Sequence, residues 1–390
     1  MATQTQAQPL VVGAGPVGLA AALFLARDGV KARIIDAAPR PSPYSKALAV
    51  NPRTLEILEP IGITAQMLAL GKPIHGARFW QGKETVGELS FQGLPHKYPF
   101  MLALSQAVTV RLLESCLNDN GVHVERGVRL VGCRHEPKSV EAELKPADGP
   151  AQTLQCPWLL AADGARSTVR EELAVQFRGN SFEKAWHLVD VPMATPLAED
   201  FAHAIFLDGG GFLFLIRVVD EPEKNGSGDP IWRVIGNDPE LLARLEIGKP
   251  TGPPIWSSEF RISHRINDCM RQGHVYFAGD AAHIHSPIGA RGMNLGIEDA
   301  WVFSRLLKCG QLSQYGQLRR KVDRRVVRRI ELLSRLARGE STTSRLLRST
   351  VLPLAARMPL ARDRLFKTLT GLDHPLASYP SDQPTDVHAG

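Results

Sequence analysis

Apolar positions near the start of the chain are spaced as in a strand, a helix and a second strand. Residues 9–12 form a short apolar run, residues 19–28 are rich in alanine and leucine and end at Gly29, and residues 31–36 form a second run. Glycine is typical just after the last turn of a helix. Because two strands joined through a helix lie parallel in one sheet, this pattern predicts the opening unit of an α/β fold.

Further along, the pattern predicts two kinds of sheet. Residues 158–162 and 274–278 are buried-strand runs, whereas residues 182–264 alternate strand-like runs with turns, which is typical of an antiparallel sheet. Helical spacing and caps predict helices from about residue 51, over 105–118 and 292–307, and from 315 onward. The runs at 122–125, 130–134 and 140–144 predict a small antiparallel unit.

Composition restricts the class of protein. The chain has 390 residues, of which 44% are hydrophobic and 22% charged, so a sizeable core is possible and wholesale disorder is excluded. Its five cysteines are scattered and form no C-x-x-C pair, which predicts a reducing cytoplasm and neither a disulfide scaffold nor a metal site. Glycines and a proline interrupt the uncharged run over 9–26, and no basic residue precedes it, so neither a signal peptide nor stable membrane insertion is expected.

The formal charge of +6 is concentrated in one late helix. An apolar stripe of Val322, Val326, Ile330 and Leu333 runs along it, and basic residues crowd its other faces. Such a helix could bind nucleic acid or an anionic membrane, or present a solvated surface. Because no aromatic residue interleaves the arginines for base stacking, we expect a solvated face and no nucleic-acid partner. The basic residues are Arg319, Arg320, Lys321, Arg324, Arg325, Arg328, Arg329, Arg335 and Arg338.

A glycine motif lies between the first strand and the first helix. In Gly13-x-Gly15-x-x-Gly18, the first glycine allows a tight turn, the second lets a pyrophosphate approach the backbone, and the third lets the helix pack against the sheet. Asp36, at the end of the next strand, is placed to accept hydrogen bonds from ribose hydroxyls. The context predicts a dinucleotide site, although this motif alone does not distinguish NAD from FAD.

Two further motifs make that choice. One is Asp163-Gly164 with the residues up to Arg170, after a buried strand; the other runs from Gly279-Asp280 through Gly292-Met293-Asn294. With these three ordered motifs the sequence resembles the class A flavoprotein aromatic hydroxylases, the para-hydroxybenzoate hydroxylase and phenol hydroxylase family, from about Leu10 to Leu307.

The resemblance implies a role for individual residues. Asp280 would hold the ribityl or pyrophosphate region of FAD, and the backbone N–H groups of Met293 and Asn294 would donate to the flavin ring. Asp163 would be linked to both FAD and the nicotinamide cofactor, although it and Asp280 could instead cap turns. The FAD-binding residues so implied are Gly13, Gly15, Gly18, Asp36, Lys46, Gln106, Asp163, Asp280, Gly292, Met293 and Asn294.

The sequence departs from the family pattern at three points. Ser45-Lys46-Ala47 has a lysine where an arginine is frequent, so a cation is kept without the arginine fork. Arg291 stands where the family often has glutamine; an added cation there could favour an anionic substrate or reduced flavin, or could point to solvent. Val110 replaces an acid found in many members.

The expected architecture is α/β, with a Rossmann-like FAD-binding domain, a second antiparallel-sheet substrate domain and a C-terminal helical segment. The FAD-binding domain would comprise 1–72, 105–181 and 265–312, the substrate domain 73–104 and 182–264, and the C-terminal segment and tail 313–390.

The resemblance implies an FAD-dependent monooxygenase that uses NADH or NADPH and O2 to hydroxylate a phenolic or polycyclic ring through a C4a-hydroperoxyflavin. A cytoplasmic monomer or homodimer with a small aromatic substrate is expected. The alternatives are a flavoenzyme of the same fold with another outcome, such as a halogenase or an isoprenoid-chain reductase, and a non-catalytic FAD-binding module. A halogenase-type Trp-x-Trp-x-Ile-Pro signature is absent from the sequence.

Candidates on the substrate side are aromatic and basic residues of the second domain. A loop with Pro287 and Gly289 is expected to position flavin and substrate, and Phe206, Phe212, Phe214 and Trp232 are candidate pocket walls. Arg217 could grip an anionic substrate or be exposed. A base for a phenol could be sought among His187, His203 and His264, although structural roles are expected for them and for His283.

Overall fold

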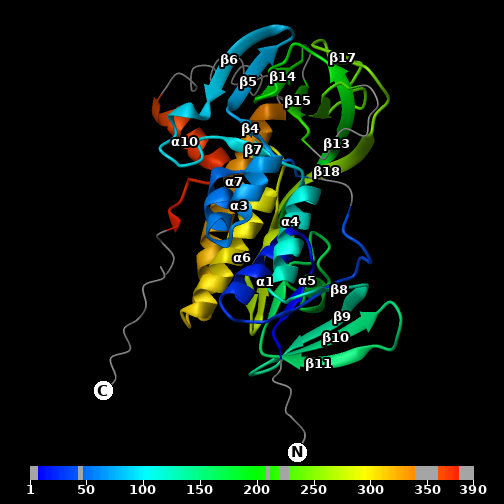
Figure 1. The fold of residues 1–390 in the computed structure, drawn as a ribbon, viewed down its shortest axis with the longest axis vertical. Helices are drawn as coiled ribbons and strands as arrows, with labels where there is room; N and C mark the ends of the chain where they lie inside the picture. The colour runs from blue at the N-terminus through cyan, green and yellow to red at the C-terminus, as the bar shows by residue number, and fades with distance from the viewer. Residues whose placement is uncertain (1–7, 43–46, 208–210, 220–227, 339–358, 377–390) are drawn as a thin grey trace, which may run out of the picture.

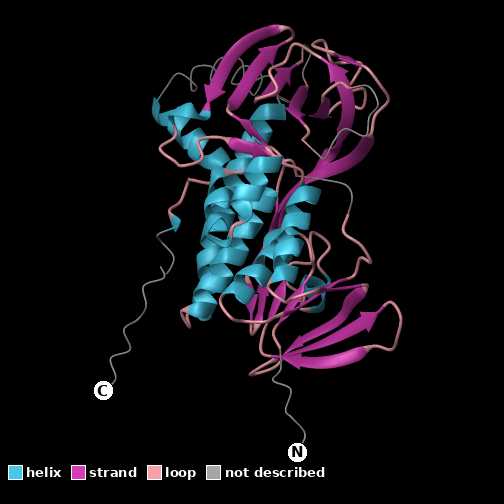
Figure 2. Cartoon of the chain, in the orientation of Figure 1, coloured by secondary structure: helices cyan, strands magenta, loops and turns pink. Residues whose placement is uncertain are grey.

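The computed structural model describes residues 8–42, 47–207, 211–219, 228–338 and 359–376. Along the long axis of the molecule, a large sheet lies at one end, a parallel sheet with its helices lies in the middle, and a small antiparallel sheet lies at the other end (Figures 1 and 2). The α/β class, the Rossmann-like part, the second sheet and the C-terminal helices are confirmed.

The central sheet has six strands in the order β19-β20-β12-β1-β2-β8. Its pairs from β20 to β8 are parallel, and β19 joins antiparallel at the edge. The alternation predicted that the run at 122–125 belongs to the small antiparallel unit, and this prediction is wrong, because the strand there pairs with β2. The residue pattern of so short a strand does not show which strand it pairs with. The strands are β1 Leu10–Val12, β2 Arg33–Asp36, β8 Val124–Arg126, β12 Leu159–Ala161, β19 Arg271–Gln272 and β20 Val275–Phe277.

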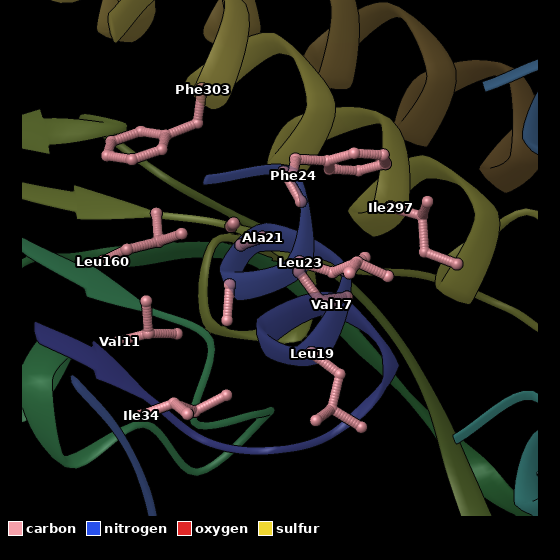
Figure 3. Close-up of a cluster of buried hydrophobic side chains, with 14 of the residues drawn as sticks. Val11, Val17, Leu19, Ala21, Leu23, Phe24, Ile34, Leu160, Ile297 and Phe303 are labelled. Atoms are coloured by element: carbon pink, nitrogen blue, oxygen red, sulfur yellow. The ribbon is translucent and has the colours of Figure 1, made fainter. Parts of the chain in front are cut away.

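Three helices pack around this sheet. They are α1 (Pro16–Arg27), α4 (Gln106–Asp119) and α6 (Gly292–Lys308). In Figure 3 the side chains of α1, such as Ala21 and Leu23, lie among residues of the strands and Ile297 of α6. Small residues on α1 let the helix approach both neighbours closely, which fixes its N-terminus against the sheet.

The large sheet has nine strands and covers the helices at one end. It is mostly antiparallel, but β14 and β5 are parallel neighbours far apart in sequence. The division of the chain into the three expected domains stays a prediction. The strands are β5 Gly76–Gln81, β6 Glu84–Ser90, β13 Phe177–Ala194, β14 Phe201–Phe206, β15 Phe212–Arg217, β16 Ile231–Gly236, β17 Lys249–Pro250, β18 Trp256–Asn267 and β21 His283–Ile284.

Smaller elements connect these layers. Strands β3 (Ala49–Val50), β7 (Met101–Ala103) and β4 (Lys72–Ile74) form one three-stranded sheet, and β9 (Val128–His135), β10 (Val140–Pro146) and β11 (Gln152–Cys156) form another. The short helices are α2 Pro52–Leu58, α3 Ile63–Leu70 and α5 Thr168–Glu172, and the 3-10 turns are η1 Glu59–Ile61, η2 Phe91–Gly93, η3 Gly279–Ala281 and η4 Leu312–Gln314. In the described residues, no helix combines the length and the apolar character that crossing a bilayer requires.

The basic helix α7 (Tyr315–Arg338) docks through its apolar stripe. Val326 and Ile330 pack with Leu295 of α6, while basic residues such as Arg320 and Arg324 are exposed, as expected for a solvated face. The prediction for Arg319 is wrong: we expected its side chain on the solvated face, but it is fully buried. Helical spacing places it beside the stripe, and its acidic partners on α6 are distant in sequence.

Arg319 ties together three carboxylates. Its Nε donates to Asp299 Oδ1 at 2.6 Å, and its Nη1 and Nη2 donate to Glu298 Oε1 at 2.6 Å and Asp323 Oδ1 at 2.7 Å. His283 Nε2 lies 2.8 Å from Asp299 Oδ2. Burial opposes the charged imidazolium, but Asp299 and Asp323 outweigh it and raise the pKa of His283 to about 9. His283, Asp299 and Asp323 have the spacing of metal ligands, yet Arg319 already donates to one oxygen of each carboxylate.

The ion pairs of Arg319 should contribute strongly to stability. Arg319→Leu should lower the unfolding free energy by about 3–5 kcal/mol, because it leaves buried carboxylates without their cation. Arg320→Leu, at the exposed neighbouring position, should change it by less than about 0.5 kcal/mol. Urea unfolding followed by circular dichroism measures both, and equal small effects would show that the cluster does not stabilise the fold.

Candidate cofactor and substrate site

The three sequence motifs meet at one edge of the central sheet. Gly13 follows β1, Asp36 ends β2, Asp163 follows β12 by two residues, and the Gly279–Asp280 turn follows β20. These four strands are neighbours and parallel, so their carboxyl ends lie together. The chain proceeds from β1 to β2 on one side and has β12 on the other, which is the crevice where open α/β sheets bind ligands.

Glycine occupies the three motif positions for different structural reasons. A Cβ on Gly13 would lie 2.4 Å from Ala162 O, and one on Gly18 would lie 1.9 Å from Gly13 O, so both positions are required for backbone packing. A Cβ on Gly15 would meet nothing within 4 Å. Gly15 is the N-cap of α1, where unpaired N–H groups and the helix dipole favour an anion. The open space at Gly15 fits a pyrophosphate.

Asp36 holds the glycine turn. Its Oδ2 accepts from Ala14 N at 2.6 Å, and its Oδ1 accepts from Ala38 N at 2.7 Å. Each carboxylate oxygen keeps a second lone pair. Asp36 therefore fixes the turn and can still accept from ribose hydroxyls.

The Asp163 motif is linked to the Gly279–Asp280 turn. Asp163 Oδ2 accepts from Val169 N at 3.2 Å, whereas Oδ1 is buried without a partner among the described residues. Burial raises the pKa of this carboxyl. Arg170 donates to Ala165 O at 2.7 Å and to Ala281 O at 3.2 Å, which joins the two motifs. An unsatisfied acceptor at this edge is what a ligand donor would complete.

The start of α6 offers backbone donors. The first helical bond runs from Leu295 N to Arg291 O at 2.8 Å, so the N–H groups of Gly292, Met293 and Asn294 precede the helical pattern. The Asn294 side chain donates to Ala49 O at 2.9 Å and Ala290 O at 2.6 Å and accepts from Asn51 N at 3.0 Å. This side chain therefore fixes the loop, and the main chain is left to face a ligand.

Three other expected residues remain, of which the structure describes Asp280 and Gln106. Asp280 is exposed in η3, and the preceding Gly279 N donates to Asp299 Oδ2 at 2.9 Å. Gln106, at the start of α4, accepts from Ala47 N at 3.3 Å. Lys46 lies outside the described residues.

The loop over residues 287–291 reaches from this edge to the large sheet. Pro287 is exposed, Gly289 and Ala290 have φ of 86° and 51°, and Ile288 packs on apolar residues of the large sheet. Arg291 differs from both alternatives considered for it: it is buried and donates to Thr368 O at 2.5 Å and Asp373 Oδ1 at 3.2 Å. These partners lie 77 and 82 residues away, so the local sequence could not reveal them.

The two faces of the large sheet separate the substrate-side candidates. Phe206 and Phe214 lie in the apolar cluster that contacts Ile288, which we call the inner face. Trp232 lies in the cluster on the opposite, outer face. Arg217 also leaves the inner face: its Nη1 donates to Val218 O at 2.8 Å and Ile231 O at 3.0 Å, and its Nε lies 3.6 Å from Glu199. Side chains alternate along a strand, and the sequence alone did not fix which parity faced inward.

Comparison with known proteins fits this geometry. The chain matches the FAD binding domain family over residues 6–330. It is 35% identical to the 6-methylpretetramide 4-monooxygenase of Streptomyces rimosus, over 98% of this chain and 73% of that protein. It is 32% identical to the pentachlorophenol 4-monooxygenase of Sphingobium chlorophenolicum, over 75% of this chain and 56% of that protein. The crystal structure of p-nitrophenol 4-monooxygenase from Pseudomonas putida DLL-E4 shares the fold, with a TM-score of 0.82, 22% identity and coverage of 94% and 98%.

The chain belongs to the FAD-binding family of flavoprotein aromatic monooxygenases. The resemblance carried by the three motifs is therefore confirmed. The residues present also fit FAD: the space at Gly15 suits its pyrophosphate, Asp36 its ribose, and the start of α6 an electron-rich ring.

The histidines considered as possible bases lie at different places on the large sheet, and a structural role for them stays a prediction. His203 lies on the outer face; Trp80 Nε1 donates to its Nδ1 at 3.1 Å, its Nε2 lies 2.9 Å from Ala198 O, and burial lowers its pKa. His264 is buried with its ring edge-on to Phe182 on the inner side, and His187 is half-buried on β13. His285, which the sequence did not single out, has a buried Nε2 without a partner in the described structure, beside Gly292, and burial lowers its pKa to about 3.

A buried ion pair on the inner face was also missed. Arg233 donates from Nε and Nη2 to the two oxygens of Asp190, both at 2.7 Å. Arg233 lies across from Ile216 in the strand register, next to the row that holds Phe214. Arg233 and Ile235 have the same parity on β16 and therefore share a face, but the sequence does not show that this face is the inner one.

Gly15 provides a direct test of the FAD position. Gly15→Ala should weaken FAD binding at least about tenfold, because the methyl group enters the space of the pyrophosphate. Its unfolding free energy without FAD should stay within about 1 kcal/mol of the parent, because the position has room and an ordinary φ of −73°. Titration of apoprotein with FAD, followed by flavin fluorescence, gives the affinity.

Gly93→Ala is the matched control, since its added methyl also meets nothing within 4 Å but lies in η2. Unchanged FAD affinity in Gly15→Ala would place the pyrophosphate elsewhere.

Proposed function

We propose that this chain is a monooxygenase that uses NADH or NADPH and O2 to hydroxylate a phenolic or polycyclic ring held between the FAD site and the large sheet. The observation that carries the proposal is the aromatic inner face of that sheet opposite the 287–291 loop. Phe79 and Phe214 each belong to the two apolar clusters that meet there, one with Ile288 and one with Ala290.

The protein's part in this reaction is to bind, orient and exclude water. FAD, when bound, would supply the redox chemistry that couples oxidation of the nicotinamide to insertion of one oxygen atom of O2 into the ring, with the other oxygen atom leaving as water. The α6 N-terminus would stabilise negative charge on the reduced flavin ring. The loop with Pro287 and Gly289 would lie beside the place where flavin and substrate react. The apolar inner face would keep water away from the reacting oxygen.

The substrate-side residues proposed here differ from the sequence-based ones at three positions. Phe206, Phe212 and Phe214 stay, joined by Phe79. Trp232 and Arg217 leave this set, because both point to the outer face. The pentachlorophenol and 6-methylpretetramide named for the two relatives support a ring substrate of this kind. A monomer or homodimer stays a prediction.

Substrate-dependent reduction tests the proposal. The purified protein should release intact FAD on denaturation, and its NAD(P)H oxidation should accelerate when a hydroxylatable phenol binds, since reduction before a ring is in place wastes reductant as peroxide. Anaerobic stopped-flow reduction with each nicotinamide, together with product analysis over a panel of phenols, measures this.

A flavoprotein that is reduced but hydroxylates nothing in the panel would favour a reductase or halogenase of the same fold. A protein with FAD that no nicotinamide reduces would favour a binding module.

Variants of the large sheet test the wall itself. Phe214→Ala should raise KM for the aromatic substrate by about tenfold or more, because it removes roughly 1–3 kcal/mol of ring contact, and should leave FAD affinity unchanged. Arg217→Met is the control on the other face of the same strand, and its KM should stay within about twofold of the parent. A large KM effect for Arg217→Met alone would return the substrate to the outer face.

A further inference from the structure

The loop over residues 287–291, which we call the cofactor loop, passes into α6 at Arg291. The side chain of Arg291 is held by a distant part of the chain. Its side chain is 1% exposed. Its Nη1 donates to Thr368 O at 2.5 Å and to Asp373 Oδ1 at 3.2 Å, and both acceptors belong to residues 359–376, which we call the C-terminal segment. A buried guanidinium is retained only where such acceptors are fixed.

The C-terminal segment is anchored at several further points. Arg53 of α2 donates from Nη2 to His374 O at 2.6 Å and from Nε to Gly371 O at 3.2 Å. His374 Nε2 lies 2.6 Å from Glu298 Oε1, which also accepts from Arg319. These contacts fix residues 371–374 against the helices that surround the FAD site.

The helical part of this segment reaches the substrate side. Helix α10 (Pro359–Thr370) lies beside the small β3-β7-β4 sheet and the large sheet (Figure 1). Phe366 packs edge-on against Phe91 with ring centroids 5.7 Å apart, in the cluster that also contains Ala290 and Phe214. A Cβ on Gly289 would lie 3.1 Å from Leu369 Cδ2, so α10 directly contacts the cofactor loop.

The loop itself needs such a tie. Gly289 and Ala290 both have positive φ, and Ala290 has no glycine-like freedom to relieve it. Backbone of this kind persists where the surrounding contacts hold it, and Arg291 is the next residue.

We propose that Arg291 is a positioning residue that ties the cofactor loop to the C-terminal segment, and that α10 is thereby a wall of the active site. The segment would set how closely the loop covers the flavin and how large a ring fits beside Phe214. This inference rests on the proposed position of FAD and is independent of whether the substrate is hydroxylated.

The test compares Arg291→Gln with Arg329→Gln in the full chain. Arg329 also donates to Asp373, at 2.7 Å, but its side chain is 44% exposed, so its loss leaves both bonds of Arg291 in place. Arg291→Gln should weaken FAD binding by about tenfold, which is roughly the loss of one charge-assisted hydrogen bond. It should also increase iodide quenching of bound flavin at saturating FAD and speed hydrogen exchange across α10. Arg329→Gln should change none of these by more than about twofold.

A merely structural arginine would lower stability without exposing the flavin, so quenching at saturating FAD separates the two roles. Arg291→Lys, which keeps the charge and one donor direction, should recover part of the affinity and serves if the glutamine variant fails to fold. Folded Arg291→Gln or Arg291→Lys with parental quenching and parental exchange across α10 would overturn the proposal. A parent protein that binds no FAD would instead refute the proposed function, while exchange across α10 would still test the tie.

Discussion

The contact on which most of the site depends is the buried guanidinium of Arg319. It holds Glu298 and Asp299 on α6 and Asp323 on its own helix. Through Asp299 it reaches Gly279 N, and hence the turn that presents Asp280. Through Glu298 it reaches His374 in the C-terminal segment. One side chain thus connects the helix that would face the flavin, the Gly279–Asp280 turn and the C-terminal segment that we propose lines the substrate side.

The chemistry of this cluster explains why it is charged. Burial alone would raise the pKa of each carboxyl. Arg319 holds the pKa values of Glu298 and Asp299 below their usual range, so both stay ionised, whereas burial raises the pKa of Asp323 to about 7. The protonated His283 supplies a second cation to Asp299. Ionised Asp299 accepts more strongly from Gly279 N than the neutral acid would, so the protonation pattern and the shape of the Gly279–Asp280 turn are coupled.

The sequence was informative where structure is local. The glycine motif, Asp36 and the start of α6 follow from short-range rules, and the structure brings them to one sheet edge. The sequence was uninformative where the partner of a residue lies far along the chain, and where the alternation along a strand does not show which side chains face inward. Arg319 and Arg291 looked like surface or cofactor-facing cations because most of the acceptors named above lie 20 to 82 residues away, Asp323 on the same helix being the exception. Trp232 and Phe214 are both aromatic strand residues, and only the packing of Ile288 shows which face is inner.

A fixed charge network suits this fold better than an apolar one in one specific respect. Well-packed apolar residues in place of a buried ion pair are often as stable or more stable, so stability alone does not explain Arg319 or Arg291. Apolar contacts have no direction, whereas a guanidinium requires its acceptors at set angles. The Gly279–Asp280 turn, the start of α6 and the C-terminal segment come from separate parts of the chain, and each must face the same small volume. Directional bonds from two buried arginines fix these backbones relative to one another, which a flavin held by main-chain groups requires.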